Sequence, residues 1–393
     1  MGHTTITIWR SKLRSAFNQN KTEKHMLTLD ETGVAPATNR GLDEVMDEIR
    51  AAKRLDYACP RNQLRFNYKE EVGYTIKLGD RFGFPTKRHF NKQLAARCAP
   101  GMTAYSRHLH STGQQDLLVH NVNSQLERDE GVAMIRTMSN GEGDAFARAI
   151  MSDKYKIVDD KEVFDVALPI IGEQGDRFRT LGGNRTDIRT YAKFISREPI
   201  AQIGKRSMFA GFQLSNSEVG QGSASFRAFF FDEYCENGCT FGNIGVFQAK
   251  FVHRGSALET KFGPVFGDKF KLAEMAAIRS AIADATRQAL DPKCHAQIAE
   301  IIERGHERQV TGDIPTVLDE IGRRVGLTEG EREQSLLHMN GDESHAYGVQ
   351  AAITRLAQDA DSYERRVELE EAGGKVLEFS NRAWNAVASL TAA

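Results

Sequence analysis

The chain lacks the features of a membrane or secreted protein. None of its apolar runs approaches the roughly 20 residues that a helix needs to cross a bilayer. The first residues, MGHTTITIWRSK, lack the apolar core of a secretory signal peptide. The five cysteines are scattered and odd in number, which argues against a disulfide framework and for a reducing compartment. We therefore predict a cytoplasmic protein that has no membrane partner.

Motifs that bind nucleotides or activate a nucleophile are absent as well. The sequence has no G-x-G-x-x-G, G-x-x-x-x-G-K-[ST] or G-x-S-x-G element. Cys235 and Cys239 are close, but no second ligand pair follows at zinc-site spacing, so structural thiols beside a turn are the favoured interpretation. His108 and His110 have no nearby cysteine or acid to complete a chelating site. We predict no catalytic residue, no metal and no cofactor from these motifs.

Net charge is also nearly absent, since the total is −1 at pH 7. A role in nucleic-acid binding must therefore depend on local patches. Residues 1–115 hold 19 lysines and arginines against 11 acidic residues, whereas residues 313–393 hold 8 against 15. This polarity suits an anionic partner at one end of the chain, or head-to-tail association into a homo-oligomer.

Acidic residues are missing altogether between Asp80 and Asp116, where basic residues are frequent. A solvated helix face would give the same run of charge, because charged side chains are mostly exposed. The missing acids favour contact with phosphate groups instead. The basic residues of this stretch are Arg81, Lys87, Arg88, Lys92, Arg97 and Arg107.

Two further basic sets fall on predicted strands. In the segment 185–193 the basic residues share one strand face, and Ile188, Ala192 and Phe194 share the other. Exposed antiparallel sheets often carry arginine and lysine, so this face is compatible with solvent as well as with nucleic acid. The residues of these sets that we predict to bind nucleic acid are Arg185, Arg189, Lys193, Arg227, Lys250 and Arg254.

The stretch from Ser207 to Arg254 has the period of two that is typical of strands with one buried face. Phe226, Ala228 and Phe230 alternate with small and polar residues, and the segment 247–251 repeats the pattern. The dipeptide at 237–238, Asn-Gly, favours a tight turn because both residues tolerate positive φ. We predict an antiparallel meander with a phenylalanine-rich core face.

The fold class is predicted as α+β: an antiparallel (mixed) β-sheet meander with packed helices and a helical C-terminal third. Further strands are expected at 64–68, 72–78, 132–138, 145–158 and 178–203, the last folded about a turn at 182–184. Helices are expected at 42–49, 86–98 and 115–128, and from Asp159 or Asp160 onward. The predicted regions are 1–85 (N-terminal arm, helix and hairpin), 86–267 (α+β core with antiparallel sheet) and 268–393 (helical).

Two details of the helical region are specific enough to check. Apolar residues from Leu272 to Ala289 follow a heptad-like seam, for which packing inside the fold is the favoured use. Thr328 and Glu331 have the spacing of a capping box.

Three segments carry a resemblance to a known family. They read RAIMSDKYKIVDDKEVFD at 148–165, NSEVGQGSASFRAFFFDEYCENGC at 216–239 and AYGVQAAITRLAQDADSYERRVELEEAGGKVLEF at 346–379. They resemble a phage- and plasmid-associated family catalogued as domain of unknown function nine-three-two, over about Thr86 to Phe379. The segment 351–354 departs from the asparagine-alanine-valine-threonine that is frequent in that family. The family has no established activity, so the resemblance implies a mobile-element origin in a bacterial host cell and carries over no catalytic residues.

Three functions follow as hypotheses. The first is a non-enzymatic nucleic-acid-binding protein of phage or plasmid DNA metabolism, similar to proteins that anneal single strands in recombination, with single-stranded DNA as its partner. The second is an enzyme acting on nucleotides or nucleic acid that holds a divalent ion at Asp232, Glu233 or Glu236. The third is an interaction protein that blocks a host defence factor.

Overall fold

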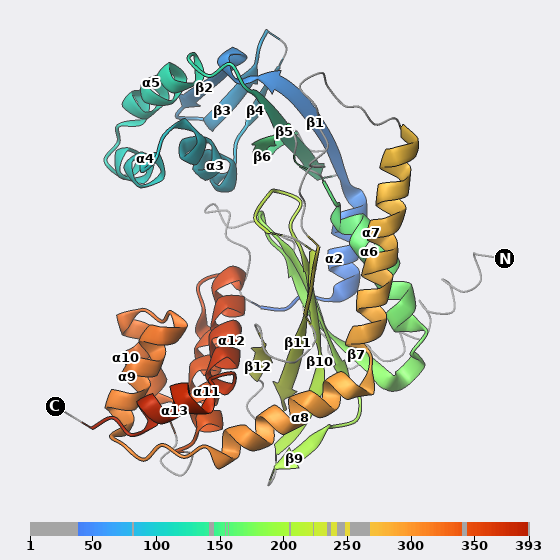
Figure 1. Ribbon diagram of the computed structural model, residues 1–393. Coiled ribbons are helices and arrows are strands. Elements are labelled where there is room, and N and C mark those ends of the chain that lie inside the picture. The colour runs from blue at the N-terminus through green and yellow to red at the C-terminus, as the bar shows by residue number, and fades with distance from the viewer. Residues whose placement is uncertain are drawn as a thin grey trace.

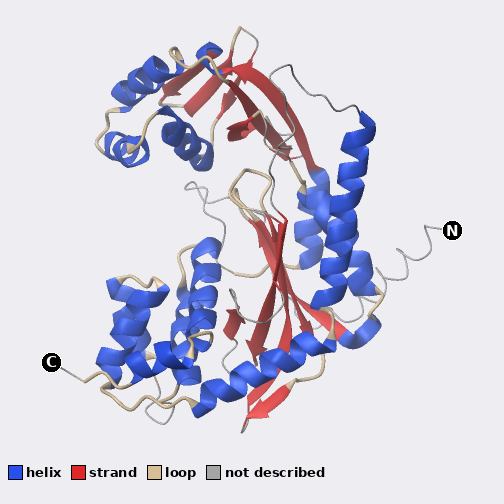
Figure 2. Ribbon diagram, in the orientation of Figure 1, coloured by secondary structure: helices blue, strands red, loops and turns tan. Residues whose placement is uncertain are grey.

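The computed structural model describes residues 38–80, 82–140, 145–153, 155, 157–203, 206–222, 224–233, 237–241, 248–251, 268–339 and 344–391. These residues form an N-terminal lobe, a central sheet and a C-terminal group of helices, which together make an open crescent (Figure 1). Figure 2 shows strands in the N-terminal lobe and the centre, and helices alone in the C-terminal third. The predicted α+β class is confirmed. No helix in the described residues is both long and apolar enough to span a membrane.

Seven antiparallel strands form the central sheet. The order along its main path is β12-β11-β10-β8-β7, with β13 paired to β11 and β9 paired to β10. The strands are β7 (Phe178–Arg185), β8 (Thr190–Ser196), β9 (Ala201–Ile203), β10 (Arg206–Asn216), β11 (Ala224–Asp232), β12 (Asn237–Thr240) and β13 (Gln248–Phe251). Because every one of these pairings is antiparallel, the meander predicted for this part of the chain is confirmed in its described strands.

The turn between β7 and β8 lies later than the sequence predicts. Arg185 still pairs with Thr190, so the turn falls at 186–189 and not at 182–184. Gly182, with φ of +90°, instead lies at an irregularity within β7. A side chain at this position would put its Cβ 2.2 Å from the carbonyl oxygen of Arg40. Glycine therefore serves here to let residue 40 pair with the edge of the sheet.

The N-terminal lobe contains two three-stranded sheets and three helices. One sheet has the order β1-β5-β6 and the other β2-β3-β4. The elements are β1 (Ala52–Pro60), β2 (Leu64–Lys69), β3 (Gly73–Leu78), β4 (Phe82–Pro85), α3 (Arg88–Cys98), α4 (Met102–Ser111), α5 (Gln115–Leu126), β5 (Val132–Asn140) and β6 (Phe146–Ser152). Strand β1 has no counterpart among the predicted strands, yet it pairs with β5 along its full length.

One face of the central sheet carries the phenylalanine-rich core. Phe194, Phe212 and Phe226 pack on α2 (Leu42–Ala51), α6 (Asp160–Gly172) and α7 (Asp268–Ala289). Phe230 lies four residues along β11 from Phe226, on the same face, and packs on α8 (Pro292–Glu307). Both Phe226 and Phe230 are fully buried, as the alternation in the sequence predicts.

The C-terminal helices pack at the β12 end of the sheet. They are α9 (Ile314–Val325), α10 (Glu329–Leu337), α11 (Ala346–Arg355), α12 (Tyr363–Leu377) and α13 (Asn381–Ala388). The predicted capping box is present, because Thr328 and Glu331 each accept a hydrogen bond from the backbone N–H of the other. The seam on α7 is internal only in its second half: Ile282 is buried, whereas Leu272 is 70% exposed.

Candidate nucleic-acid interface

Three of the predicted basic residues lie free on the surface of the N-terminal lobe. Arg88 and Lys92 are exposed and four residues apart on α3, so they share one face of that helix. Arg107 is exposed on α4, which packs beside α3. Within the described ranges no carboxylate lies within ion-pair distance of any of the three. Their charge is therefore available to an external anion.

The other basic residues of the acid-free stretch are placed differently. Lys87 is half-buried, with its ammonium 5.1 Å from the centre of the Phe146 ring. Arg97 lies nine residues after Arg88, which puts it on the opposite side of α3 at 100° per residue. Its Nε donates a hydrogen bond to the carbonyl oxygen of Ile150 at 3.2 Å. Arg81, Arg254 and the side chain of Lys250 lie outside the described residues.

The basic strand face is not the exposed surface that the sequence predicts. Lys193 is 1% exposed, and its Nζ donates to Glu370 Oε1 of α12 at 2.6 Å. Burial lowers the pKa of Lys193, against the opposing effect of Glu370. Arg185 is buried as well. The predicted exposure is therefore wrong for Lys193 and Arg185. The predicted shared face is wrong as well, because Arg185 pairs with Thr190, three residues before Lys193 on β8, and so points to the opposite side of the sheet from Lys193. Both sides of the sheet are covered at these positions.

The remaining members of the two strand sets are half-buried and have partners. Arg227 on β11 forms an ion pair with Glu371 of α12. Arg189 donates to the Ser215 hydroxyl at 3.1 Å and to the carbonyl oxygen of Gln221 at 2.5 Å. These interactions hold the sheet to its neighbours and leave less of each guanidinium for an external ligand.

A buried charge network that the sequence analysis missed surrounds Glu218, in the loop after β10. Its carboxylate is fully buried and pairs with arginines from two sheets. Oε2 accepts from Arg54 Nε at 3.1 Å and from Arg148 Nη1, and Arg185 Nη2 lies 3.6 Å away. Arg136 Nη1 donates to the backbone oxygen of Glu218 at 3.1 Å. One arginine each from β1, β5, β6 and β7 thus converges on one residue.

The same carboxylate begins helix α6. Glu218 Oε1 accepts a hydrogen bond from the backbone N–H of Asp160 at 2.8 Å, which satisfies a donor at the helix N-terminus. Asp159 occupies the cap position without a side-chain cap. The carboxylate of Asp160 turns inward and accepts from Thr190 at 2.7 Å and from Asn216 at 2.9 Å. Helix α6 thus begins where the sequence predicts, but its first backbone donor is satisfied by a residue far along the chain and not by the side chain of Asp159.

The two buried carboxyl groups respond oppositely to their surroundings. Burial alone would raise the pKa of Glu218, but the arginines, Arg148 and Arg54 foremost, hold it well below its usual range. Burial and then the neighbouring Glu218 raise the pKa of Asp160 to about 6, although Arg185 opposes them. At neutral pH the network contains four arginines around a firmly ionised glutamate.

The sequence feature that could have indicated this buried network is the presence of arginines in apolar strands. Arg148 lies in the apolar run AFARAIM and Arg136 in VAMIRTM. A charged side chain in an otherwise apolar strand needs a buried partner, because an uncompensated charge is costly to remove from water. The sequence gives no indication of which carboxylate serves.

The raised pKa of Asp160 gives a pH-dependent prediction. An acid whose pKa is higher in the folded state binds more protons there, so its contribution to stability is lost as pH rises. For Asp160 this window runs from about 4 to about 6. We expect the free energy of unfolding of Asp160→Asn, measured relative to wild type by urea titration, to increase across this window. A difference that does not vary with pH would contradict this assignment.

The acidic residues proposed for a divalent ion do not form a site in the described structure. Asp232 is buried and accepts from the Tyr347 hydroxyl at 2.8 Å and from Arg206 Nη1 at 3.4 Å. Glu233 is exposed, and Glu236 lies outside the described residues. Nowhere in the described ranges do three or more histidine, cysteine or acidic side chains gather to hold a metal.

Comparison with protein-family models, with curated proteins and with solved structures found no match. The resemblance to the phage- and plasmid-associated family thus stays a prediction based on the three sequence segments.

Proposed function

We propose that the protein binds single-stranded nucleic acid through the exposed basic residues of α3 and α4, as a non-enzymatic protein of phage or plasmid DNA metabolism. The observation that supports this most is the set of Arg88, Lys92 and Arg107, which are exposed, without ion-pair partners in the described structure, and free of acidic neighbours in the sequence. Neutralising phosphates with such residues is the main source of affinity in nonspecific binding.

A single strand is favoured over a duplex by an exposed aromatic ring. Tyr105 on α4 is 43% exposed, two residues before Arg107. An unpaired base can stack on such a ring, whereas the bases of a duplex already stack on each other. The N-terminal lobe thus offers exposed cations and an exposed ring, although Tyr105 and Arg107, about 200° apart around α4, do not share one helix face.

Binding is expected to depend steeply on salt, and to lose part of this dependence when the three cations are removed. We expect the triple variant Arg88→Gln, Lys92→Gln, Arg107→Gln to reduce the slope of log K against log salt by about 2, since each phosphate contact contributes about 0.7 for a single strand. Fluorescence anisotropy with a labelled oligonucleotide measures this slope. Arg382→Gln, an exposed arginine on α13, is the matched control. Absence of binding by wild type at low salt would overturn the proposal, as would a triple variant that matches the control.

Head-to-tail self-association is proposed as a second property, on the uneven charge of the two chain ends. Part of the acidic surplus of residues 313–393 is already used by basic residues of the central sheet, since Glu370 pairs with Lys193 and Glu371 with Arg227. We therefore expect a weak association that dissociates as salt rises, because exposed pairs are screened within about 10 Å at 0.1 M salt. Light scattering at low and high salt measures it, and a monomer mass under both conditions rules it out.

A further inference from the structure

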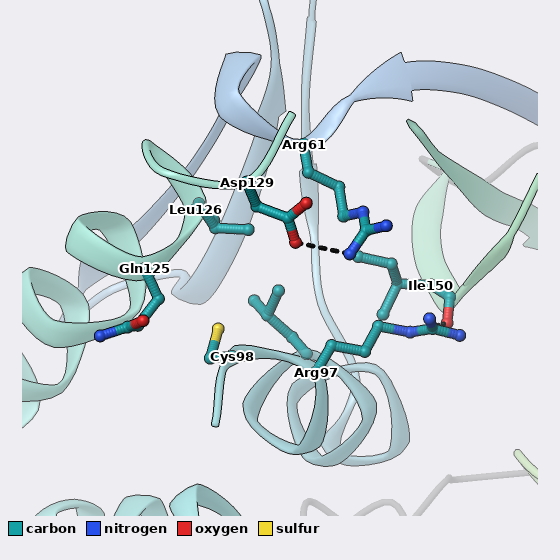
Figure 3. Close-up of a pocket in the computed structure, with 8 residues that line it drawn as sticks. Arg61, Arg97, Cys98, Gln125, Leu126, Asp129 and Ile150 are labelled. Atoms are coloured by element: carbon teal, nitrogen blue, oxygen red, sulfur yellow. Dashed lines mark hydrogen bonds and ion pairs between the residues drawn. The ribbon is translucent and has the colours of Figure 1, made fainter. Parts of the chain in front are cut away.

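A small recess opens in the N-terminal lobe between α3, the end of α5, β6 and the short helical turn Arg61–Gln63 that precedes β2 (Figure 3). It encloses about 270 Å³ of space not filled by atoms, part of it continuous with solvent. Arg61 extends into it from one side and Arg97 from the other, near Ile150, while Cys98 and Gln125 line the far side. The recess is thus lined by arginines from two separate elements, and the guanidinium of Arg97 lies beside the Ile150 carbonyl.

The positive charge in this recess exceeds the negative charge. Asp129 is its one acidic lining residue, and its carboxylate forms an ion pair with Arg61. The two guanidiniums are close enough that Arg61, after burial, contributes to lowering the pKa of Arg97. One positive charge therefore remains without a counter-ion among the lining side chains.

Several hydrogen-bond donors in the recess also lack acceptors. The Nε of Arg61 is buried and has no partner in the described residues. Arg97 uses only its Nε, on Ile150, so neither of its Nη groups has a described protein acceptor. A buried donor such as Arg61 Nε is rarely left unpaired. Arg97 is exposed, so its Nη groups are accessible to an external acceptor.

The position of Arg61 depends on a glycine opposite it. A Cβ at Gly131 would lie 2.1 Å from Arg61 Nη2, and the backbone N–H of Arg61 donates to the Gly131 oxygen at 2.8 Å. Gly131 N–H in turn donates to Asp129 Oδ1 at 3.0 Å. The backbone thus allows the guanidinium to fold across the chain and holds its carboxylate partner in place.

We propose that this recess binds a phosphate group, either that of a small phosphate compound or that of a nucleic-acid strand. The tetrahedral oxygens of phosphate can accept from two guanidiniums that approach from different sides, whereas the two oxygens of a carboxylate match the fork of one. The recess lies on the side of α3 opposite Arg88 and Lys92, so this binding is separable from the surface proposed above.

Cys98 does not make the recess a site of phosphoryl transfer. Burial, and after it Asp129, raise the pKa of the Cys98 thiol to about 11. The thiol is protonated at neutral pH, and a protonated thiol is a poor nucleophile. The recess holds a phosphate and leaves it unchanged.

The first test measures binding of inorganic phosphate to the full chain by ³¹P NMR line broadening, at constant ionic strength. We expect saturable binding by wild type and at least about a tenfold weaker affinity for Arg97→Gln, since hydrogen bonds to charged groups are the strong ones. Asp129→Asn keeps the side-chain shape and removes the competing charge, so we expect it to bind phosphate more tightly. An unfolded variant would only lose affinity for phosphate. Weaker binding by Arg97→Gln together with tighter binding by Asp129→Asn therefore indicates a change at the site and not a loss of the fold.

Arg382→Gln, on α13 and outside both proposed binding surfaces, is the control and should bind phosphate as wild type does. A second arm compares a single strand carrying a 5′-phosphate with the same strand carrying a 5′-hydroxyl. A preference that Arg97→Gln abolishes identifies a strand end as the source of the phosphate, whereas phosphate binding without this preference identifies a small compound. Absence of saturable phosphate binding by wild type, or equal affinity in Arg97→Gln, would overturn the proposal even where the strand still binds through α3 and α4.

Discussion

Replacing Glu218 with glutamine is expected to lower the free energy of unfolding by about 3–5 kcal/mol, the usual cost of removing one partner from a buried ion pair. The carboxylate is fully buried and is the only described acid that pairs with Arg54 and Arg148. Glutamine keeps the shape of the side chain but leaves these guanidiniums without a carboxylate at ion-pair distance in the described residues. It also weakens the acceptor for the N–H of Asp160 at the start of α6.

Asp160→Asn is the matched variant, because it changes a second buried carboxyl in the same network. Since the pKa of Asp160 is raised to about 6, its side chain is mostly neutral in the folded protein at pH 5. Asp160→Asn should therefore lower the free energy of unfolding only slightly at that pH. Urea unfolding of both variants, followed by circular dichroism, measures the difference. If both variants lower the free energy of unfolding equally at pH 5, the Glu218 carboxylate contributes no more to stability than that of Asp160.

The second large effect concerns Lys193 and Glu370, which link β8 to α12. Each is 1% exposed, so removing one of them leaves a buried charge and should cost about 3–5 kcal/mol. Glu370→Leu should cost more than Lys193→Met, because Arg366 Nε still lies 3.4 Å from Glu370 when the lysine is gone. The double variant should recover most of the loss, since an apolar pair of similar volume often replaces a buried ion pair without cost.

A double-mutant cycle measures this coupling from four unfolding curves. Strong non-additivity is expected because the two side chains are in direct contact. Arg287→Met on α7 is the control, since Arg287 is exposed and its pair with Asp284 should contribute little. Additive losses in the Lys193 and Glu370 variants would contradict a mainly electrostatic link between sheet and helix.

Periodicity was sufficient to predict the apolar face of the central sheet. Phe226, Ala228 and Phe230 are spaced by two and so share one face of β11, which packs on α7 and α8. The same alternation cannot distinguish a polar face in water from a polar face that is covered. Glu370, which covers Lys193, is 177 residues away in the chain, so no local pattern indicates the pairing.

Two further differences between the prediction and the structure, at strand β1 and at Arg185, also arise from contacts between distant parts of the chain. Strand β1 has mostly exposed or half-buried side chains, including Leu55 at 59%, so it carries little apolar alternation. Its strand state depends on pairing with β5, about 80 residues later. Among the basic residues, helical spacing correctly places Arg88 and Lys92 on one exposed face of α3. Arg185 is buried by contacts with distant parts of the chain, which its own segment does not indicate.

The arrangement around Glu218 also sets an order of events during synthesis. The four arginines on β1, β5, β6 and β7 all precede Glu218 in the chain, Arg54 by 164 residues. A nascent chain therefore presents Arg54 and Arg148 well before their shared carboxylate leaves the ribosome. Because the cost of closing so long a loop precedes any gain from the contact, the joint between the N-terminal lobe and the central sheet forms late. Until residue 218 has emerged, the N-terminal lobe carries Arg54 and Arg148 without their shared carboxylate, at the place that later becomes its junction with the sheet.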